Sequence, residues 1–320
     1  MNRRFLILYF SGTGNTDYVA RQVYERILHF GHACVIKSVD WIWARAGRGP
    51  GRRGNEQELA RHLAELNNGV TDLVLAYPTY ASDVPRPLAE ILPLLPDVDG
   101  VRMSVVATYA LAGGDGCDVP ERVLRPKGYK TFVTGYVKMP NNFKLPPVNH
   151  PEIENGAKLD HFHRSSAREI DEIVGHLIDG HRHTEGRGLG ARLLGFSQRA
   201  TEQMMAGAIA RHMFATAACV KCRLCESTCP MGNITFTHEY PEFADRCCSC
   251  LRCYHSCPAE AIQVTDKTRD TDKYPRYKGF DHWHPPRLYQ KQHGEASHGG
   301  DESHVAAGQP ANAPAEAATS

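Results

Sequence analysis

The sequence predicts an α/β protein with a doubly wound, parallel, five-stranded sheet, followed by a small cysteine-rich module. Over residues 1–180, apolar β-branched runs alternate with helical patterns, which is typical of a parallel sheet covered on both faces. A glycine-rich loop joins the first run to the first helix. Nine of the 11 cysteines lie between Cys219 and Cys257, so the second part of the 320-residue chain has a different chemistry.

The strands are expected where the chain is continuously apolar, because a strand buried on both faces needs no alternation of polar residues. Four runs are clear and one, at residues 33–38, is weaker. The clear runs are residues 5–10, 70–77, 101–109 and 131–137.

Helices are expected between these runs and after the last one. Gly31 follows the first helix where a left-handed cap is expected. The last helix carries Ile170, Ile173 and Leu177 at helical spacing. The expected helices are residues 17–30, 55–66, 86–95, about 120–124 and 160–178.

Composition divides the chain into four parts. Residues 1–180 form the sheet domain, and residues 181–211 a connector that leads into a helical segment at 191–212. Residues 212–268 hold the cysteine module. The part from 269 to 320 is polar, with few large apolar residues toward its end, and is expected to be disordered.

One insertion in the sheet domain, residues 45–54, is rich in glycine and arginine. The segment could dock an acidic partner, but arginines separated by glycines are not expected to build a rigid patch, so it is predicted to be a solvated, mobile loop.

Charge and hydropathy exclude several classes of partner. Lys plus Arg number 37 and Asp plus Glu 36, so the net charge of +1 gives no general attraction to nucleic acid or anionic membranes. No apolar run approaches the ~20 residues of a membrane helix, and the run at 5–10 is too short for a secretory leader. A cytoplasmic protein without nucleic-acid partners or membrane insertion is expected.

The glycine-rich loop has the form of a phosphate site. Residues 11–16 read S-G-T-G-N-T between the first strand and the first helix, so backbone N–H groups and a helix N-terminus face an anion. A P-loop would carry lysine where Asn15 stands, and a dinucleotide loop would carry a third glycine where Asp17 stands. A monophosphate ester such as FMN fits better. The expected phosphate ligands are Ser11, Gly12, Thr13, Gly14, Asn15 and Thr16.

This loop resembles the phosphate loop of flavodoxins, S/T-x-T-G-N-T at the same place. The resemblance implies strand order 2-1-3-4-5 over residues 1–180, with FMN at the carboxyl ends of the central strands. It also implies that Tyr80 and Tyr109 stack on the flavin, although both could be strand-end tyrosines that serve packing. The expected ring contacts are Pro78, Thr79, Tyr80, Thr108, Tyr109 and Gly113.

The cysteines form an internal repeat. Residues 219–230 read C-V-K-C-R-L-C-E-S-T-C-P, and residues 247–258 read C-C-S-C-L-R-C-Y-H-S-C-P, 28 positions later. The pattern C-x₂-C-x₂-C-x₃-C-P is the bacterial iron–sulfur signature, whose fourth cysteine ligates the other cluster. Zinc does not require the repeated C-x₃-C-P, and disulfides require an oxidising compartment.

Two [4Fe–4S] clusters are therefore expected. One is assigned to Cys219, Cys222, Cys225 and Cys257, and the other to Cys247, Cys250, Cys253 and Cys229. Cys34, Cys117 and Cys248 are expected to be non-ligand thiols.

The cysteine segment resembles two-cluster bacterial ferredoxins, which implies a small α+β domain. Together the two parts resemble a family of flavodoxin-like domains fused to such a ferredoxin, over about residues 4–265. The sequence M-P-N-N-F at residues 139–143 also resembles that family. The resemblance implies an electron carrier that links FMN, two clusters and a partner oxidoreductase.

Two other functions remain open. The flavin could act directly on a small substrate, or the clusters could serve as a redox sensor. The loop carboxylates Asp83, Asp115 and Asp118 are expected to be solvated or to cap turns rather than to catalyse. Cationic side chains such as Arg252 are expected to raise the potential of a nearby cluster.

Overall fold

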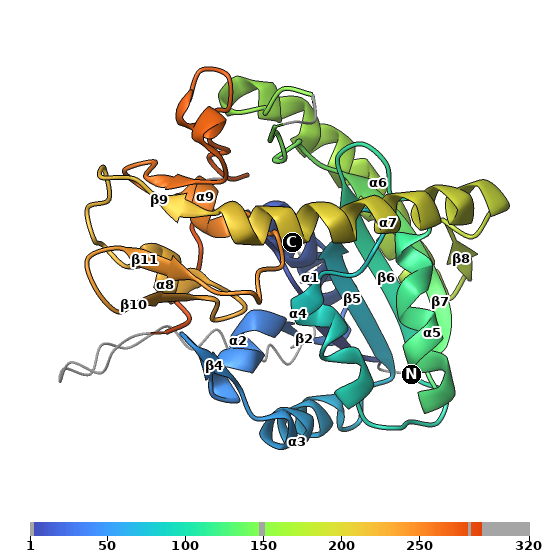
Figure 1. Cartoon of the computed structure of the whole chain (residues 1–320). Coiled ribbons are helices and arrows are strands. Elements are labelled where there is room, and N and C mark those ends of the chain that lie inside the picture. Colours follow the sequence, from blue (N-terminus) through green and yellow to red (C-terminus); the bar gives the residue numbers. More distant parts are fainter. Residues whose placement is uncertain (1–2, 147–150, 281–282, 290–320) are drawn as a thin grey trace, which may run out of the picture.

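A parallel sheet forms the centre of the first part of the chain (Figure 1). The computed structural model describes residues 3–146, 151–280 and 283–289. The strands are β1 (Arg4–Tyr9), β2 (Ala33–Ser38), β5 (Asp72–Pro78), β6 (Arg102–Tyr109), β7 (Lys130–Lys138) and β8 (His183–Thr184). Their order is β2-β1-β5-β6-β7-β8, and every neighbouring pair is parallel. The first five give the flavodoxin-like order 2-1-3-4-5, which confirms the predicted fold class for this domain.

The predicted number of strands is wrong, because the sheet has six within the described residues. The additional strand, β8, pairs with β7 inside the segment predicted to be a connector. Two residues cannot show a hydrophobic period, so sequence patterning gave no indication of this strand.

Alternate residues of each strand face opposite layers. Phe5 and Ile7 point to a layer formed by α1 (Asn15–His29) and α6 (Asp160–Asp179). Leu6 and Leu8 point to the layer on the other face. The helices of that layer are α2 (Val39–Arg45), α3 (Glu56–Asn67), α4 (Arg86–Ala89) and α5 (Val119–Leu124).

The helix expected at residues 86–95 is interrupted. It consists of α4 followed by a 3-10 turn at Leu92–Leu94, with Pro93 in that turn. Proline lacks a donor and clashes with the preceding turn of an α-helix, which explains the break. Short 3-10 turns also occur at Gly116–Asp118, Arg125–Lys127 and Gly156–Leu159.

The cysteine module is a second small unit beside the sheet (Figure 1). A 24-residue helix, α7 (Leu189–His212), leads into it. Two antiparallel pairs and two short helices form the module, and a 3-10 turn at Asp266–Arg269 follows. The pairs are β9 (Phe214–Ala215) with β12 (Ile262–Gln263) and β10 (Ile234–Phe236) with β11 (Pro241–Phe243), and the helices are α8 (Leu224–Thr228) and α9 (Arg252–Ser256).

The prediction of a mobile loop at residues 45–54 is wrong. The segment contains a hairpin of β3 (Arg48–Gly49) and β4 (Arg52–Arg53). Arg48 is buried, stacks 3.4 Å above the Trp43 ring and pairs with Glu90 at 2.5 Å. The N–H of Gly51 donates to the carbonyl of Gly232 in the cysteine module. An arginine that reaches an aromatic face and a carboxylate is ordered by those partners, whatever glycines flank it.

The disordered tail was predicted to begin at residue 269, which is also too early. Residues 270–280 and 283–289, named here the C-terminal strap, pack across both units. Phe280 is fully buried between Tyr18 and His163 of the sheet domain. The N–H of Leu288 donates to the carbonyl of Ser227 in the cysteine module. Residues 290–320 lie outside the described residues.

None of the helices in the described ranges has both the length and the apolar composition required of a membrane span.

Candidate functional site

The glycine-rich loop turns directly from β1 into α1. Gly14 precedes the helix in the left-handed region, with φ of 103°, which favours glycine. Its N–H donates to the Ser11 hydroxyl at 3.1 Å. Packing also limits the loop from outside, because a Cβ on Gly14 would lie 2.7 Å from Trp283. The loop therefore holds a fixed curl that a larger residue would disturb.

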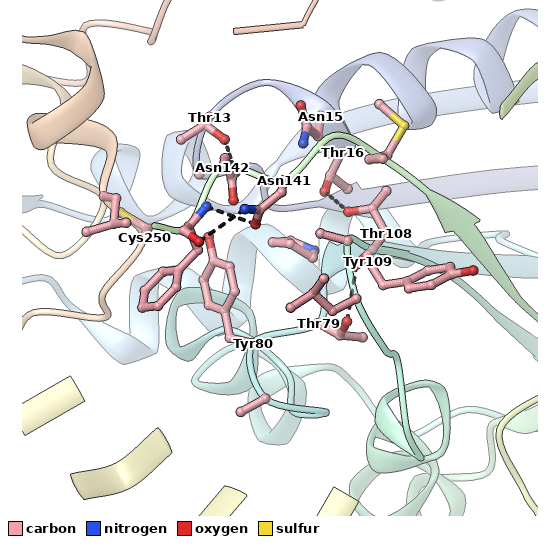
Figure 2. A pocket seen from close by; sticks show the side chains of 18 of the residues that line it. Thr13, Asn15, Thr16, Thr79, Tyr80, Thr108, Tyr109, Asn141, Asn142 and Cys250 are labelled. Atoms are coloured by element: carbon pink, nitrogen blue, oxygen red, sulfur yellow. Dashed lines mark hydrogen bonds between the residues drawn. The ribbon is translucent and has the colours of Figure 1, made fainter. Parts of the chain in front are cut away.

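A pocket of about 420 Å³ opens at the carboxyl ends of β1, β5 and β6 (Figure 2). This is the edge at which a doubly wound sheet binds its ligand. Most of the predicted cofactor residues line the pocket. They are Ser11, Gly12, Thr13, Asn15, Thr16, Pro78, Thr79, Tyr80, Thr108 and Tyr109.

Two predicted residues do not line it. Gly14 lies at the outer side of the loop against Trp283. Gly113 packs under Tyr136, whose hydroxyl donates to the carbonyl of Gly113 at 3.1 Å. Its role is thus to allow the close approach of an aromatic ring, since a Cβ there would be 2.2 Å from that ring.

The polar side chains of the loop are held by partners from elsewhere in the chain. Asn142 donates to the Thr13 hydroxyl, and Asn15 donates to the carbonyl of Pro140 at 3.0 Å. The amide oxygen of Asn15 accepts a bond of 2.6 Å from Tyr277 in the strap. Figure 2 shows Thr13 and Asn142 pointing toward one another across the pocket rim. These contacts order the loop before any ligand arrives.

Tyr80 and Tyr109 lie at different ends of the pocket (Figure 2). Tyr80 is on the side of Cys250, and the Tyr80 hydroxyl and the Cys250 carbonyl both lie close to Gly12. Tyr109 stands edge-on to Tyr136, with ring centroids 5.7 Å apart. Burial raises the pKa of both phenols, so both remain protonated at neutral pH.

Several lining residues were not predicted as ligands. The segment 139–143 forms one wall. Its resemblance to the flavodoxin–ferredoxin fusion family was noted from the sequence, but none of its residues was predicted as a ligand. Ser197, Gln198 and Ile209 of α7 form a second wall. Residues 249–251 of the cysteine module form a third. No local sequence pattern indicates the last two walls, because they depend on how the second half of the chain packs.

The eight predicted cluster cysteines gather around two small cavities. Cys219, Cys222, Cys225 and Cys257 line the first, named here the distal cavity. Cys229, Cys247, Cys250 and Cys253 line the second, the proximal cavity, together with Cys248. Each group combines three cysteines of one repeat with the fourth of the other, as in the sequence assignment. Among the described residues, no three His, Cys, Asp or Glu side chains are placed to hold a single metal ion.

The repeat is visible in the backbone as well as in the sequence. Lys221 and Arg223 in the first copy have φ of 57°, and Ser249 and Leu251 in the second have φ of 53° and 56°. A short helix follows each loop, α8 in the first copy and α9 in the second. The two loops therefore share one conformation, which turns their cysteines inward.

Backbone N–H groups point at the sulfurs. The N–H of Asn233 lies 3.3 Å from Cys229 Sγ, that of Ser249 lies 3.4 Å from Cys247 Sγ and that of Ala261 lies 3.3 Å from Cys257 Sγ. Such donors stabilise thiolates and help to set the potential of a sulfur-bound iron cluster. The residues present thus fit an anionic iron–sulfur group.

Burial and local hydrogen bonds set the pKa values of the thiols. Burial raises the pKa of Cys225 and Cys247 to about 12. A hydrogen bond from Cys248, opposed by burial and aided by Arg252, lowers the pKa of Cys250 to about 7. Cys34 and Cys117 are buried in the sheet domain, where burial raises their pKa further, so their thiols are poor nucleophiles.

The loop carboxylates are less exposed than expected. Asp115 is buried and pairs with Arg199 of α7 at 2.6 Å, and Asp118 pairs with Arg187 at 3.0 Å. The first of these ion pairs joins α7 to the loop after β6, and the second joins that loop to the segment before α7. Asp83 instead binds its own turn, where its carboxylate accepts from the N–H of Val84 at 2.7 Å.

Comparison with known proteins gives structural likeness only. No family model and no curated protein matches the chain. Among solved structures, a flavodoxin from Streptococcus pneumoniae TIGR4 is 12% identical, with a TM-score of 0.35, over 55% of this chain and 98% of its own. The NAD(P)H:quinone oxidoreductase from Methanothermobacter marburgensis is 14% identical, with a TM-score of 0.38, over 57% of this chain and 100% of its own. Rubredoxin oxygen:oxidoreductase from Desulfovibrio gigas is 14% identical, with a TM-score of 0.33, over 53% of this chain and 37% of its own.

Proposed function

We propose that this chain is an electron-transfer protein that passes electrons between an FMN and two [4Fe–4S] clusters, and on to a partner oxidoreductase. One observation carries the proposal. Cys250 lines both the pocket beside the glycine-rich loop and the proximal cysteine cavity. Two redox sites that share a wall are close enough for direct transfer within one molecule.

The pocket suits a flavin phosphate. Hydroxyls and amides of the loop supply neutral donors, and the N-terminus of the 15-residue helix α1 adds its dipole. Among the described residues that line the pocket, none is Asp, Glu, His, Lys or Arg. Its volume of about 420 Å³ lies in the range of small-molecule sites. Tyr80 and Tyr109 would bound the ring, as the resemblance to flavodoxins implies.

The two cavities would hold the clusters. Cys219, Cys222, Cys225 and Cys257 would bind the distal cluster, and Cys229, Cys247, Cys250 and Cys253 the proximal one. When bound, FMN exchanges two electrons and each cluster one. The chain positions these groups, supplies N–H donors to the sulfurs and excludes water from the proximal cavity, whose Cys229 and Cys248 are buried.

The exposure of the distal cavity supports the proposal that a partner protein would dock there. Cys222 is exposed, and Val220 beside it is 64% exposed, with Lys221 exposed between them. The proximal cavity, in contrast, faces the sheet domain. The distal loop would therefore exchange electrons with the partner, and the proximal loop with the flavin pocket.

The experiment measures electron transfer after photoreduction of the flavin in anaerobic, fully loaded protein. Native protein is expected to show a first-order change of cluster absorbance whose rate is independent of protein concentration. Cys250→Ser is expected to remove it. Cys222→Ser is the matched variant in the other loop. It should retain the first-order change of cluster absorbance, but its rate of electron delivery to cytochrome c should fall by about tenfold or more. A native rate that rises with protein concentration would contradict the proposal.

The competing function, direct action on a small substrate, has less support. The described pocket lining offers no carboxylate or histidine for proton transfer. Substrate-dependent turnover by the loaded protein without a partner would favour it.

A further inference from the structure

Arg252 belongs to the cysteine module, but its guanidinium lies against the glycine-rich loop of the sheet domain. The residue is 1% exposed. It donates to the carbonyl of Ser11 at 2.5 Å and to the carbonyl of Gly12 at 3.2 Å. A third donation goes to the carbonyl of Thr228 at 2.8 Å, within the module.

Asp40 supplies the counter-charge. Its carboxylate lies 2.7 Å from Arg252 Nη2, and both side chains are 2% exposed. A buried guanidinium is costly unless it is paired and its donors are satisfied. Here the carboxylate of α2 and three backbone carbonyls meet this demand together. The guanidinium is thus fixed in one position, and so are the carbonyls that it binds.

The internal repeat shows that cluster binding does not require this arginine. Cys250-Leu-Arg252-Cys253 in the second copy corresponds to Cys222-Arg-Leu224-Cys225 in the first. Leucine therefore stands at the equivalent position, although both loops have the same backbone conformation. Arg252 serves a need that only the loop beside the pocket has.

The two loops are also in direct contact. A Cβ on Gly12 would lie 2.9 Å from the Cys250 carbonyl, so little space separates them. Three of the seven residues from 247 to 253 are proposed cluster ligands, and Ser249 and Leu251 have positive φ. Such a conformation is strained for these residues and needs support from the surrounding structure. Loss of the proximal cluster would remove part of that support and loosen the loop that carries Arg252 toward Asp40 and the glycine-rich loop.

We propose that Arg252 is a positioning residue that makes phosphate binding by the glycine-rich loop depend on the cluster held by Cys229, Cys247, Cys250 and Cys253. This inference rests on the proposed function. By linkage, flavin binding stabilises the proximal cluster to the same extent as that cluster strengthens flavin binding.

The test measures the dissociation constants of FMN and of riboflavin, which lacks the phosphate. Native protein and Arg252→Met are each measured with clusters bound and again after a chelator has removed the clusters. Hydrogen bonds to a charged group contribute about 1.5–3 kcal/mol, so FMN binding is expected to weaken by about tenfold or more in cluster-loaded Arg252→Met. Riboflavin binding should change by less than about twofold.

Cluster removal should weaken FMN binding in native protein. In Arg252→Met it should cause little further weakening, because the coupling residue is already absent. Arg246→Met is the matched control. Arg246 is also buried and donates to the Gly232 carbonyl at 2.9 Å, away from the glycine-rich loop. Its substitution should leave FMN binding unchanged. Iron content confirms cluster loading in each variant. If Arg252→Met does not take up clusters, Arg252→Lys, which keeps the charge, replaces it.

Two results would overturn the inference: FMN affinity in loaded Arg252→Met within about twofold of native, or an equal loss for FMN and riboflavin, which indicates a general structural defect. Failure of the proposed function is distinguishable, since native protein itself would then bind no FMN or no clusters.

Discussion

Close packing at single residues joins the two halves of this molecule. Gly12 is the clearest example, because its Cα faces the Tyr80 hydroxyl and the Cys250 carbonyl at once. The glycine-rich loop, an aromatic residue of the pocket and a cysteine loop meet there. The residue type is dictated by this approach, since Gly12 does not have the positive φ that requires glycine at position 14.

Gly12→Ala tests this contact. The added Cβ would be 2.4 Å from the Tyr80 hydroxyl and 2.9 Å from a backbone oxygen that cannot move aside. Overpacking of this kind costs about 1–3 kcal/mol, to be measured by urea unfolding. Gly190→Ala is the control, because no atom lies within 4 Å of its Cβ position in α7. Equal stability of the two variants would contradict the packing described.

A pH-dependent contribution comes from Asp72 at the start of β5. Burial favours its neutral form, but hydrogen bonds from Arg3, Thr71 and Arg102 outweigh burial and lower the pKa of this carboxyl. A lowered folded-state pKa gives stability that is complete above the unfolded value of about 4 and is lost as the pH falls through the folded value.

Asp72→Asn should therefore lower the free energy of unfolding by about 3–5 kcal/mol at neutral pH, and the difference from native should shrink below pH ~4. Asp97→Asn is the control, because Asp97 is 84% exposed and, within the described ranges, its one ion pair is with Lys127, at 3.0 Å. A difference for Asp72→Asn that stays constant into acid would show that ionisation is not its cause.

At this scale the sequence predicted the residues of the glycine-rich loop and of the two cysteine cavities better than the remaining walls of the pocket. Motif spacing found the S-G-T-G-N-T loop and the eight cysteines, because their geometry is local or repeated. Asn142, Gln198 and Leu251 were not predicted, since their place in the pocket depends on contacts between distant segments. Arg252 was expected to affect a cluster through charge, and its bonds to the loop were not foreseen.

Elements without periodic patterns account for the differences in fold. The hairpin at residues 48–53, the two-residue strand β8 and the C-terminal strap all lack a helical or strand repeat. Each is stabilised by tertiary contacts instead. In the strap, Arg276 is buried 3.4 Å above the Tyr254 ring, and Tyr277 binds Asn15. Composition alone assigned these residues to a disordered tail.

Phe280→Ala measures what the strap contributes. The ring is fully buried, and its centroid lies 4.7 Å from the ring centroid of Tyr18 and 4.4 Å from that of His163. Its truncation should reduce the free energy of unfolding by about 3–5 kcal/mol. Phe30→Ala, at a position 54% exposed, should cost less than about 1 kcal/mol. Equal effects would mean that the strap does not stabilise the sheet domain.

At the scale of the whole molecule, the proximal cavity adjoins the pocket, with which it shares Cys250 and Leu251. The distal cavity shares no lining residue with the pocket. The distal cavity has an exposed cysteine, Cys222. This arrangement favours a conduit between a protein partner and a flavin over two independent redox modules.

The arrangement predicts unequal effects of losing each cluster. Cys222→Ser should leave about four irons, with FMN affinity within about twofold of native, because the proximal loop and Arg252 are intact. Cys250→Ser should weaken FMN binding by about tenfold or more. Fluorescence titration with FMN, together with iron analysis, measures both. Equal losses in the two variants would contradict this arrangement of sites.

Cofactor content of the full chain, purified without oxygen and supplied with FMN, iron and sulfide, is the decisive measurement. We expect about eight irons, about eight sulfides and about one FMN per chain. Zinc in place of iron, or protein that takes up no flavin, would contradict it.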